Sequence, residues 1–148
     1  MKAPSRPLRL AAALALAVAS LAACSGMGGG SMAGGGGSLK LSGSEEVPPI
    51  TTSGSGTGSI AVAADGSVSG KIRTTGLSGT AAHIHSGGAG TNGPVVLPLV
   101  KSGEGEWSVP PGAKLTPDQV KAYQAGELYV NVHTDANKGG EIRAQLKP

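Results

Sequence analysis

Apolar and polar residues alternate along most of the chain after Leu39, and glycine-rich breaks separate the alternating segments. Because successive side chains of a strand point to opposite faces, this alternation predicts β-strands that bury one face. The spacing indicates about eight short strands in one domain, residues 39–148. We expect strands at Leu39–Leu41, Gly58–Ala63, Val68–Thr74, Ala81–His85, Val95–Val100, Glu106–Val109, Leu128–His133 and Glu141–Leu146.

The breaks between these segments carry turn signals. Asp65-Gly66 predicts a two-residue hairpin turn of type I′, and Asn137–Gly140 predicts a turn between the last two strands. Pro98 has no backbone N–H and indicates an edge or a bulge in the fifth strand. Short strands separated by turns favour an antiparallel β-sandwich or barrel.

One segment has helical signals instead. Thr116 is suited to the N-cap, Pro117 to the first helical position, and Gln119 completes a capping box. Gly126 is suited to end the helix. We therefore expect a single short helix among the strands.

The N-terminus has the composition of an export signal. Three cations precede an apolar run of 13 residues, Leu10–Ala22, which is too short to span a bilayer as a mature helix. The run ends in Leu21-Ala22-Ala23-Cys24, which resembles the bacterial lipobox, in which the cysteine is lipidated. We expect residues 1–23 to be a lipoprotein signal peptide and Cys24 to carry a membrane anchor. The alternative is an ordinary cleavage site that happens to precede a cysteine.

Residues 24–38 are mostly Gly, Ser, Met and Ala, and are typical of a flexible tether. Ser25 after the cysteine resembles the outer-membrane sorting pattern of Gram-negative lipoproteins. Without the three cations of the signal, the chain has nine basic and nine acidic residues and a formal net charge of zero. This balance, with few aromatic residues, argues against a nucleic-acid partner.

All three histidines lie in predicted strands. His83 and His85 share one face of their strand. On a second strand, His133 shares a face with Asn131 and Tyr129. Neutral imidazole suits copper, zinc, iron and nickel. If the two strands are neighbours, the histidines can hold one ion, with their nitrogens roughly 3–4 Å apart. The alternative is that they hydrogen-bond the backbone of loops.

Other polar residues are candidates for a supporting role. Asn131 and Asp135 are candidates to orient an imidazole, and Arg143 to bind an anion near the metal. For Arg143, an exposed ion pair with Glu141 is the favoured alternative.

Two further segments have residues suited to chemistry. Glu45 and Glu46 are a possible acid/base pair, but a solvated turn is the favoured interpretation. Gly87–Gly93 is followed by a strand rather than a helix, which argues against a phosphate-binding loop and favours a flexible loop, or a lid over the histidines. No Ser-His-Asp or Cys-His arrangement is recognisable, so no catalytic residue is predicted.

Several segments, in order, resemble the CHRD domain, the family named for chordin. The resemblance covers Leu39 to Leu146 and implies an extracellular β-sandwich domain, but little about chemistry. The matching segments are Glu45–Pro49, Ala82–His85, Asn92–Val96, Leu128–Thr134 and Gly139–Arg143.

A weaker resemblance concerns the histidines. The His-Ile-His strand and the later Val-His strand are similar to the copper-ligand pattern of Cu/Zn superoxide dismutase, a Greek-key barrel. This implies copper ligands at His83, His85 and His133, and an all-β, antiparallel Greek-key fold. The chain has no further histidine for a zinc site, and Cys24 has no partner for an internal disulfide.

The sequence therefore predicts an envelope lipoprotein that binds one copper ion, with zinc less favoured, and that handles copper or confers tolerance to it. The alternatives are a non-catalytic module that binds a protein or polysaccharide and, less favoured, a dismutase-like enzyme.

Overall fold

The computed structural model describes residues 36–148, so the predicted signal peptide, Cys24 and most of the predicted tether lie outside the described residues. Within this range, no helix is long and apolar enough to cross a membrane. The elements are β1 (Ser38–Ser42), a 3-10 turn (Gly43–Glu45), β2 (Ser55–Val62), β3 (Val68–Thr75), β4 (Gly79–Ser86), β5 (Val95–Pro98), β6 (Val100–Gly103), β7 (Glu106–Ser108), α1 (Pro117–Gln124), β8 (Leu128–Thr134) and β9 (Ile142–Gln145).

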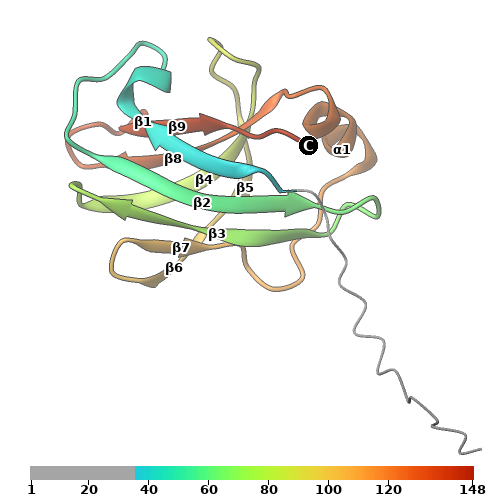
Figure 1. Cartoon of the computed structure of the whole chain (residues 1–148). Helices are drawn as coiled ribbons and strands as arrows, with labels where there is room; N and C mark the ends of the chain where they lie inside the picture. Colours follow the sequence, from blue (N-terminus) through green and yellow to red (C-terminus); the bar gives the residue numbers. More distant parts are fainter. Residues whose placement is uncertain (1–35) are drawn as a thin grey trace, which may run out of the picture. The chain divides into compact units, whose positions relative to one another are not determined.

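The strands form one antiparallel sheet in the order β5-β4-β8-β9-β1-β2-β3-β7-β6 (Figure 1). The order is not sequential, because β8 and β9 lie between β4 and β1. The sheet folds over at the junction of β9 and β1, which pair only at Ser42 and Arg143. Its two edge strands, β5 and β6, are consecutive in the chain, so the sheet nearly closes on itself. The predicted all-β antiparallel fold with one short helix is confirmed.

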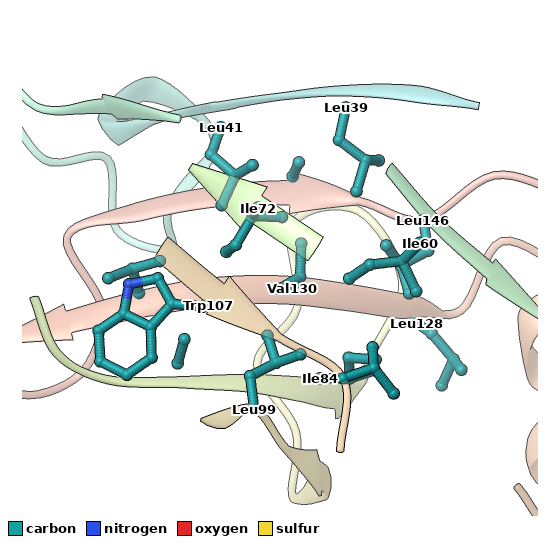
Figure 2. Packing of buried hydrophobic residues seen from close by; sticks show 14 of the residues in the cluster. Leu39, Leu41, Ile60, Ile72, Ile84, Leu99, Trp107, Leu128, Val130 and Leu146 are labelled. Carbon is teal, nitrogen blue, oxygen red and sulfur yellow. The ribbon is translucent and has the colours of Figure 1, made fainter. Parts of the chain in front are cut away.

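The core lies between the two layers of the folded sheet and consists of the inward-facing residues, which alternate along each strand (Figure 2). Ile84, Val130 and Val132 are completely buried there. Burial of each such side chain contributes roughly 1.5–3 kcal/mol to the free energy of unfolding. Because the chain has no phenylalanine, aliphatic side chains supply most of this stabilisation. Trp107 also lies in this core, with 3% of its surface exposed.

The expected strand Val95–Val100 is wrong as a single element. The structure has two strands here, with Leu99 between them. β5 pairs with β4 at one edge of the sheet, whereas β6 pairs with β7 at the other edge. Pro98 has no backbone N–H to donate to a neighbouring strand. The side chain of Leu99 is buried in the core, which fixes the connection between β5 and β6.

The expected type I′ turn at Asp65-Gly66 is also wrong. That turn needs a positive φ at both central residues, and in the described chain every residue with positive φ is a glycine. The Asp65 carboxylate instead accepts hydrogen bonds from the Ser67 N–H and hydroxyl, at 2.9 and 2.8 Å. Gly66 takes the left-handed conformation with φ 86°. The aspartate therefore closes a longer loop with its side chain.

The helix agrees with its sequence signals. The Thr116 hydroxyl accepts a hydrogen bond from the Gln119 N–H, and the Gln119 side chain accepts one from the Thr116 N–H. This is the expected capping box. Gly126, with φ 73°, follows the end of α1.

Candidate metal centre

The histidines come together because β4 and β8 are neighbours. The two strands pair antiparallel, with His83 opposite Asn131 and Ala81 opposite His133. His83 and His133 are therefore diagonal neighbours on the face that points away from the core. Val130 and Val132 point into the core, as the alternation predicted.

The possible ligand atoms of the three imidazoles lie within 4.8 Å of one another. His83 Nδ1 and His133 Nε2 are 2.9 Å apart, a hydrogen-bond distance close to the lower end of the spacing expected for ligands of one ion. The widest pair exceeds the expected 3–4 Å, so binding an ion requires it to close by about 1 Å. Such a displacement is within the range of small side-chain rotations.

Backbone carbonyls orient two of the three rings. His85 Nδ1 lies 3.0 Å from the Gly93 carbonyl oxygen, and His133 Nδ1 lies 2.9 Å from that of Lys138. Each Nδ1 must therefore carry the proton, so each Nε2 has a lone pair. In this structure the Nε2 of His133 accepts a hydrogen bond from His83 Nδ1, which a bound ion would replace. A carbonyl acceptor behind the imidazole is the usual support of a metal-bound histidine. His85 Nε2 is buried without a hydrogen-bond partner, which fits a metal ligand.

The electrostatics favour the form of histidine that binds metals. Burial lowers the pKa of His83, and the neighbouring His133 and His85 lower it further. Burial also lowers the pKa of His85, against the opposing effect of the hydrogen bond to Gly93. Both rings are neutral at neutral pH, and the neutral ring is the one with a lone pair to donate.

Much of the outer face of these strands is covered by other chain segments, whereas His83 and His133 remain partly exposed. The chain segments that cover it contribute Glu46 and the Gly87–Gly93 loop. The face is formed by His85, Tyr129, Asn131 and Arg143, which are exposed by 8%, 2%, 1% and 1%. We call Glu46, His85, Tyr129, Asn131 and Arg143 the polar layer.

Arg143 holds the cover in place. Its guanidinium donates to the Gly88 carbonyl at 2.9 Å and to Asn92 Oδ1 at 3.3 Å. Asn92 in turn donates to the Val47 carbonyl at 2.7 Å, which ties the two covering segments together. The loop reaches the histidines through Gly93, the acceptor for His85.

The expected exposed ion pair of Arg143 with Glu141 is wrong. The guanidinium carbon of Arg143 lies 3.5 Å from the centre of the Tyr129 ring, a cation–π contact. The Tyr129 ring also stacks on His85, with centroids 5.0 Å apart and planes 7° from parallel. Glu141 accepts hydrogen bonds from Thr52, Thr134 and Asn137. The alternation placed Arg143 on the correct face but could not reveal that loops cover this face.

The other two candidates for support differ in position. Asn131 lies in the middle of the site, opposite His83, with its Nδ2 donating to the Gly139 carbonyl at 3.3 Å. Asp135 is exposed in the turn after β8. The acceptor that His133 meets in this turn is the Lys138 carbonyl.

Glu46 is a member of the site that the sequence did not reveal. The expectation of a solvated turn holds for exposed Glu45 but is wrong for Glu46, which is 5% exposed. Burial raises the pKa of Glu46 to about 7, although the Arg143 charge and the Asn131 amide oppose this shift. The carboxylate pair before Val47-Pro48 was the one available signal, and it does not indicate which residue turns inward.

Comparison with known proteins identifies the family of the domain. A family model described as the CHRD domain matches residues 38–146, nearly all of the described fold. Neither the comparison with curated proteins nor the comparison with solved structures finds a match.

Proposed function

The chain belongs to the CHRD domain family, and from that premise we propose that it binds one copper ion through His83, His85 and His133 in the cell envelope. The observation that carries the proposal is the clustering of the three possible ligand atoms within 4.8 Å. The carbonyl acceptors behind His85 and His133 support it, because they fix the proton on Nδ1 and make Nε2 the nitrogen with a lone pair.

Copper is preferred to zinc for two reasons. Three imidazoles suit both ions. The His-Ile-His and Val-His strands resemble the copper-ligand strands of Cu/Zn superoxide dismutase, whereas the chain has no further histidine for a zinc site of that kind. Export to the envelope, which the N-terminal sequence predicts, also matches a protein that meets copper outside the cytoplasm.

The proposed location depends on the N-terminal sequence alone. The apolar run before Leu21-Ala22-Ala23-Cys24 supports export and lipidation of Cys24. The lipid would hold the domain at a membrane surface, the outer membrane in a Gram-negative host. The biological role would then be copper handling or tolerance.

An interaction module is the second candidate, and one observation favours it. Val95 and Val100 are the large hydrophobic residues with high exposure in the described chain, at 52% and 47%. They belong to the two edge strands, β5 and β6, which have free backbone groups to pair with a partner. A protein or polysaccharide that binds there would leave the histidines uninvolved.

A titration of the purified chain with Cu(I), Cu(II) and Zn(II) distinguishes these functions. The copper proposal predicts one tight site in the wild type and none in the triple variant His83→Ala, His85→Ala, His133→Ala. Equal binding by both proteins, or binding by neither, would refute it and leave the interaction module. A Lys114→Ala variant, altered far from the histidines on an exposed residue, is the matched control.

A further inference from the structure

Three buried acceptor atoms without hydrogen-bond partners lie in the polar layer. They are Glu46 Oε1, Asn131 Oδ1 and His85 Nε2. One further buried polar atom of the described residues has no partner, the Trp107 Nε1–H donor, and it belongs to the apolar core. Buried polar atoms are normally paired, since an unpaired one costs about 1–3 kcal/mol. A group of unpaired acceptors therefore indicates residues arranged for a cation or a proton donor.

The orientation of Asn131 connects these atoms. Its Nδ2 donates to the Gly139 carbonyl, a contact that its Oδ1 cannot make. The same Nδ2 and Glu46 Oε1 both lie close to the Gly140 backbone, so the nitrogen end of the amide is on the side of the carboxylate. Oδ1, at the other end of the amide, is buried without a hydrogen-bond partner. Asn131 lies opposite His83 in the ladder, so this unpaired oxygen belongs to the strand position beside the histidines.

Glycine at position 140 makes this arrangement possible. A Cβ there would lie 2.4 Å from Asn131 Nδ2 and 2.5 Å from Glu46 Oε1. Asn131 Nδ2 and Glu46 Oε1 therefore both lie against the backbone of Gly140. Gly140 also has φ 133°, a backbone conformation that residues with a side chain rarely adopt. The backbone leaves space for the contact between the carboxylate and the amide.

We propose that Glu46 is a positioning residue of the metal centre, which fixes the Asn131 carboxamide so that Oδ1 faces the ion held by the histidines. The inference depends on the proposed copper site. Asn131 Oδ1 adds an oxygen acceptor beside the three imidazoles, available to the ion or to a water in its open position. Glu46 contacts neither and acts through Asn131.

Two variants of Glu46 test this role. Glu46→Leu fills a similar volume but offers no acceptor, and we expect about 10-fold weaker Cu(II) binding, the usual scale for a residue that orients a ligand. Glu46→Gln keeps a side-chain oxygen of the same size beside Asn131 Nδ2, so it should recover part of the affinity. Glu45→Gln, at the exposed neighbour, is the matched control and should bind as the wild type does.

A double-mutant cycle shows whether Glu46 acts through Asn131. We expect Glu46→Leu to weaken binding no further once Asn131→Ala is present. Independent, additive losses would overturn the proposal, as would wild-type affinity in Glu46→Leu. Thermal unfolding of each metal-free variant identifies any loss that comes from misfolding.

A metal-free measurement separates this inference from the proposed function. NMR hydrogen exchange of the Asn131 side-chain amide should accelerate in Glu46→Leu and stay slow in Glu45→Gln. Unchanged exchange would overturn the positioning role even if copper binds. Faster exchange in a protein that binds no copper would retain the contact but refute the metal centre.

Discussion

Val130 and Asn131 are neighbours in β8 and are both almost completely buried, with exposed fractions of 0% and 1%, yet they lie in opposite layers. Val130 packs in the apolar core between the two halves of the sheet. Asn131 lies in the polar layer, between the histidines and the covering loops. One strand therefore separates two interiors of different chemistry.

The two interiors differ in what the burial of their side chains does to the stability of the fold. The core gains stability from each apolar side chain removed from water. The polar layer contains a carboxylate, a guanidinium, an amide and an imidazole, and three of its acceptor atoms have no hydrogen-bond partner. Burial of such groups costs free energy unless they are paired. This layer therefore stabilises the fold less than the apolar core does, and its unpaired acceptors are consistent with the proposed metal site.

The largest expected effects separate adjacent residues of β4. Ile84→Ala should reduce the free energy of unfolding by about 2–5 kcal/mol, because it leaves a cavity in the core. His83→Ala should change stability by no more than about 1 kcal/mol, since the ring is only half-buried, as typical of substitutions near the surface. Urea unfolding measures both.

Copper affinity should show the opposite pattern. Loss of a residue that supports a ligand can weaken metal binding by about 100-fold. His83→Ala removes a ligand itself, so it should weaken Cu(II) binding by more than that. Folded Ile84→Ala should bind as the wild type does. If Ile84→Ala weakened binding as strongly as His83→Ala, the two interiors would not be functionally distinct.

The next largest effect measures how much free energy of unfolding is lost by burying Glu46 in the polar layer. Glu46 has a pKa of about 7 in the fold, against 4.5 when unperturbed. Between these values the folded state binds more protons than the unfolded state, so this group lowers stability as pH rises. Glu46→Gln should therefore stabilise the metal-free protein at pH 8, by up to about 3 kcal/mol, and have little effect at pH 4.5.

Chemical denaturation of both proteins across this pH range measures the difference. A stability gain that does not depend on pH would mean that the carboxyl group does not titrate as its burial implies. A loss of stability at pH 8 would mean that ionised Glu46 is well paired and that its layer is not costly.

A smaller effect is expected away from both interiors. Thr116→Ala removes the N-cap of α1, whose hydroxyl accepts from the Gln119 N–H, and should cost about 1 kcal/mol. Copper affinity should not change. The loss is measured by thermal unfolding, with Thr116→Ser as the control that keeps a capping hydroxyl.

The smallest effect concerns Asp135. Because this residue is exposed and His133 has the Lys138 carbonyl as its acceptor, Asp135→Ala should change stability by less than about 0.5 kcal/mol. Its copper affinity should equal that of the wild type by calorimetry. A clear loss of affinity would restore Asp135 as a support of His133.

The part of this organisation that could be predicted is the local part. Alternation identified the strands around His83 and His133 and assigned Val130 and Val132 to the core, because both follow from the period of a strand. The capping box at Thr116 is likewise local. These features need only a few consecutive residues.

The rest depends on contacts between distant segments. Arg143 is buried because the loop at Gly88 and Asn92 folds over it, from more than 50 positions away. Glu46 is buried because its segment packs against Asn131 and Gly140, which lie more than 80 positions away, whereas the pattern of its own segment resembles a solvated turn. The split of Val95–Val100 into β5 and β6 depends on the closure of the barrel. None of these follows from periodicity.

Anomalous diffraction from crystals of the copper-loaded protein tests the central claim most directly. We expect one copper peak on the outer face of β4 and β8, about 2.0 Å from a nitrogen of each of His83, His85 and His133. A peak at another position, or none at the histidines in a protein that binds copper, would contradict it.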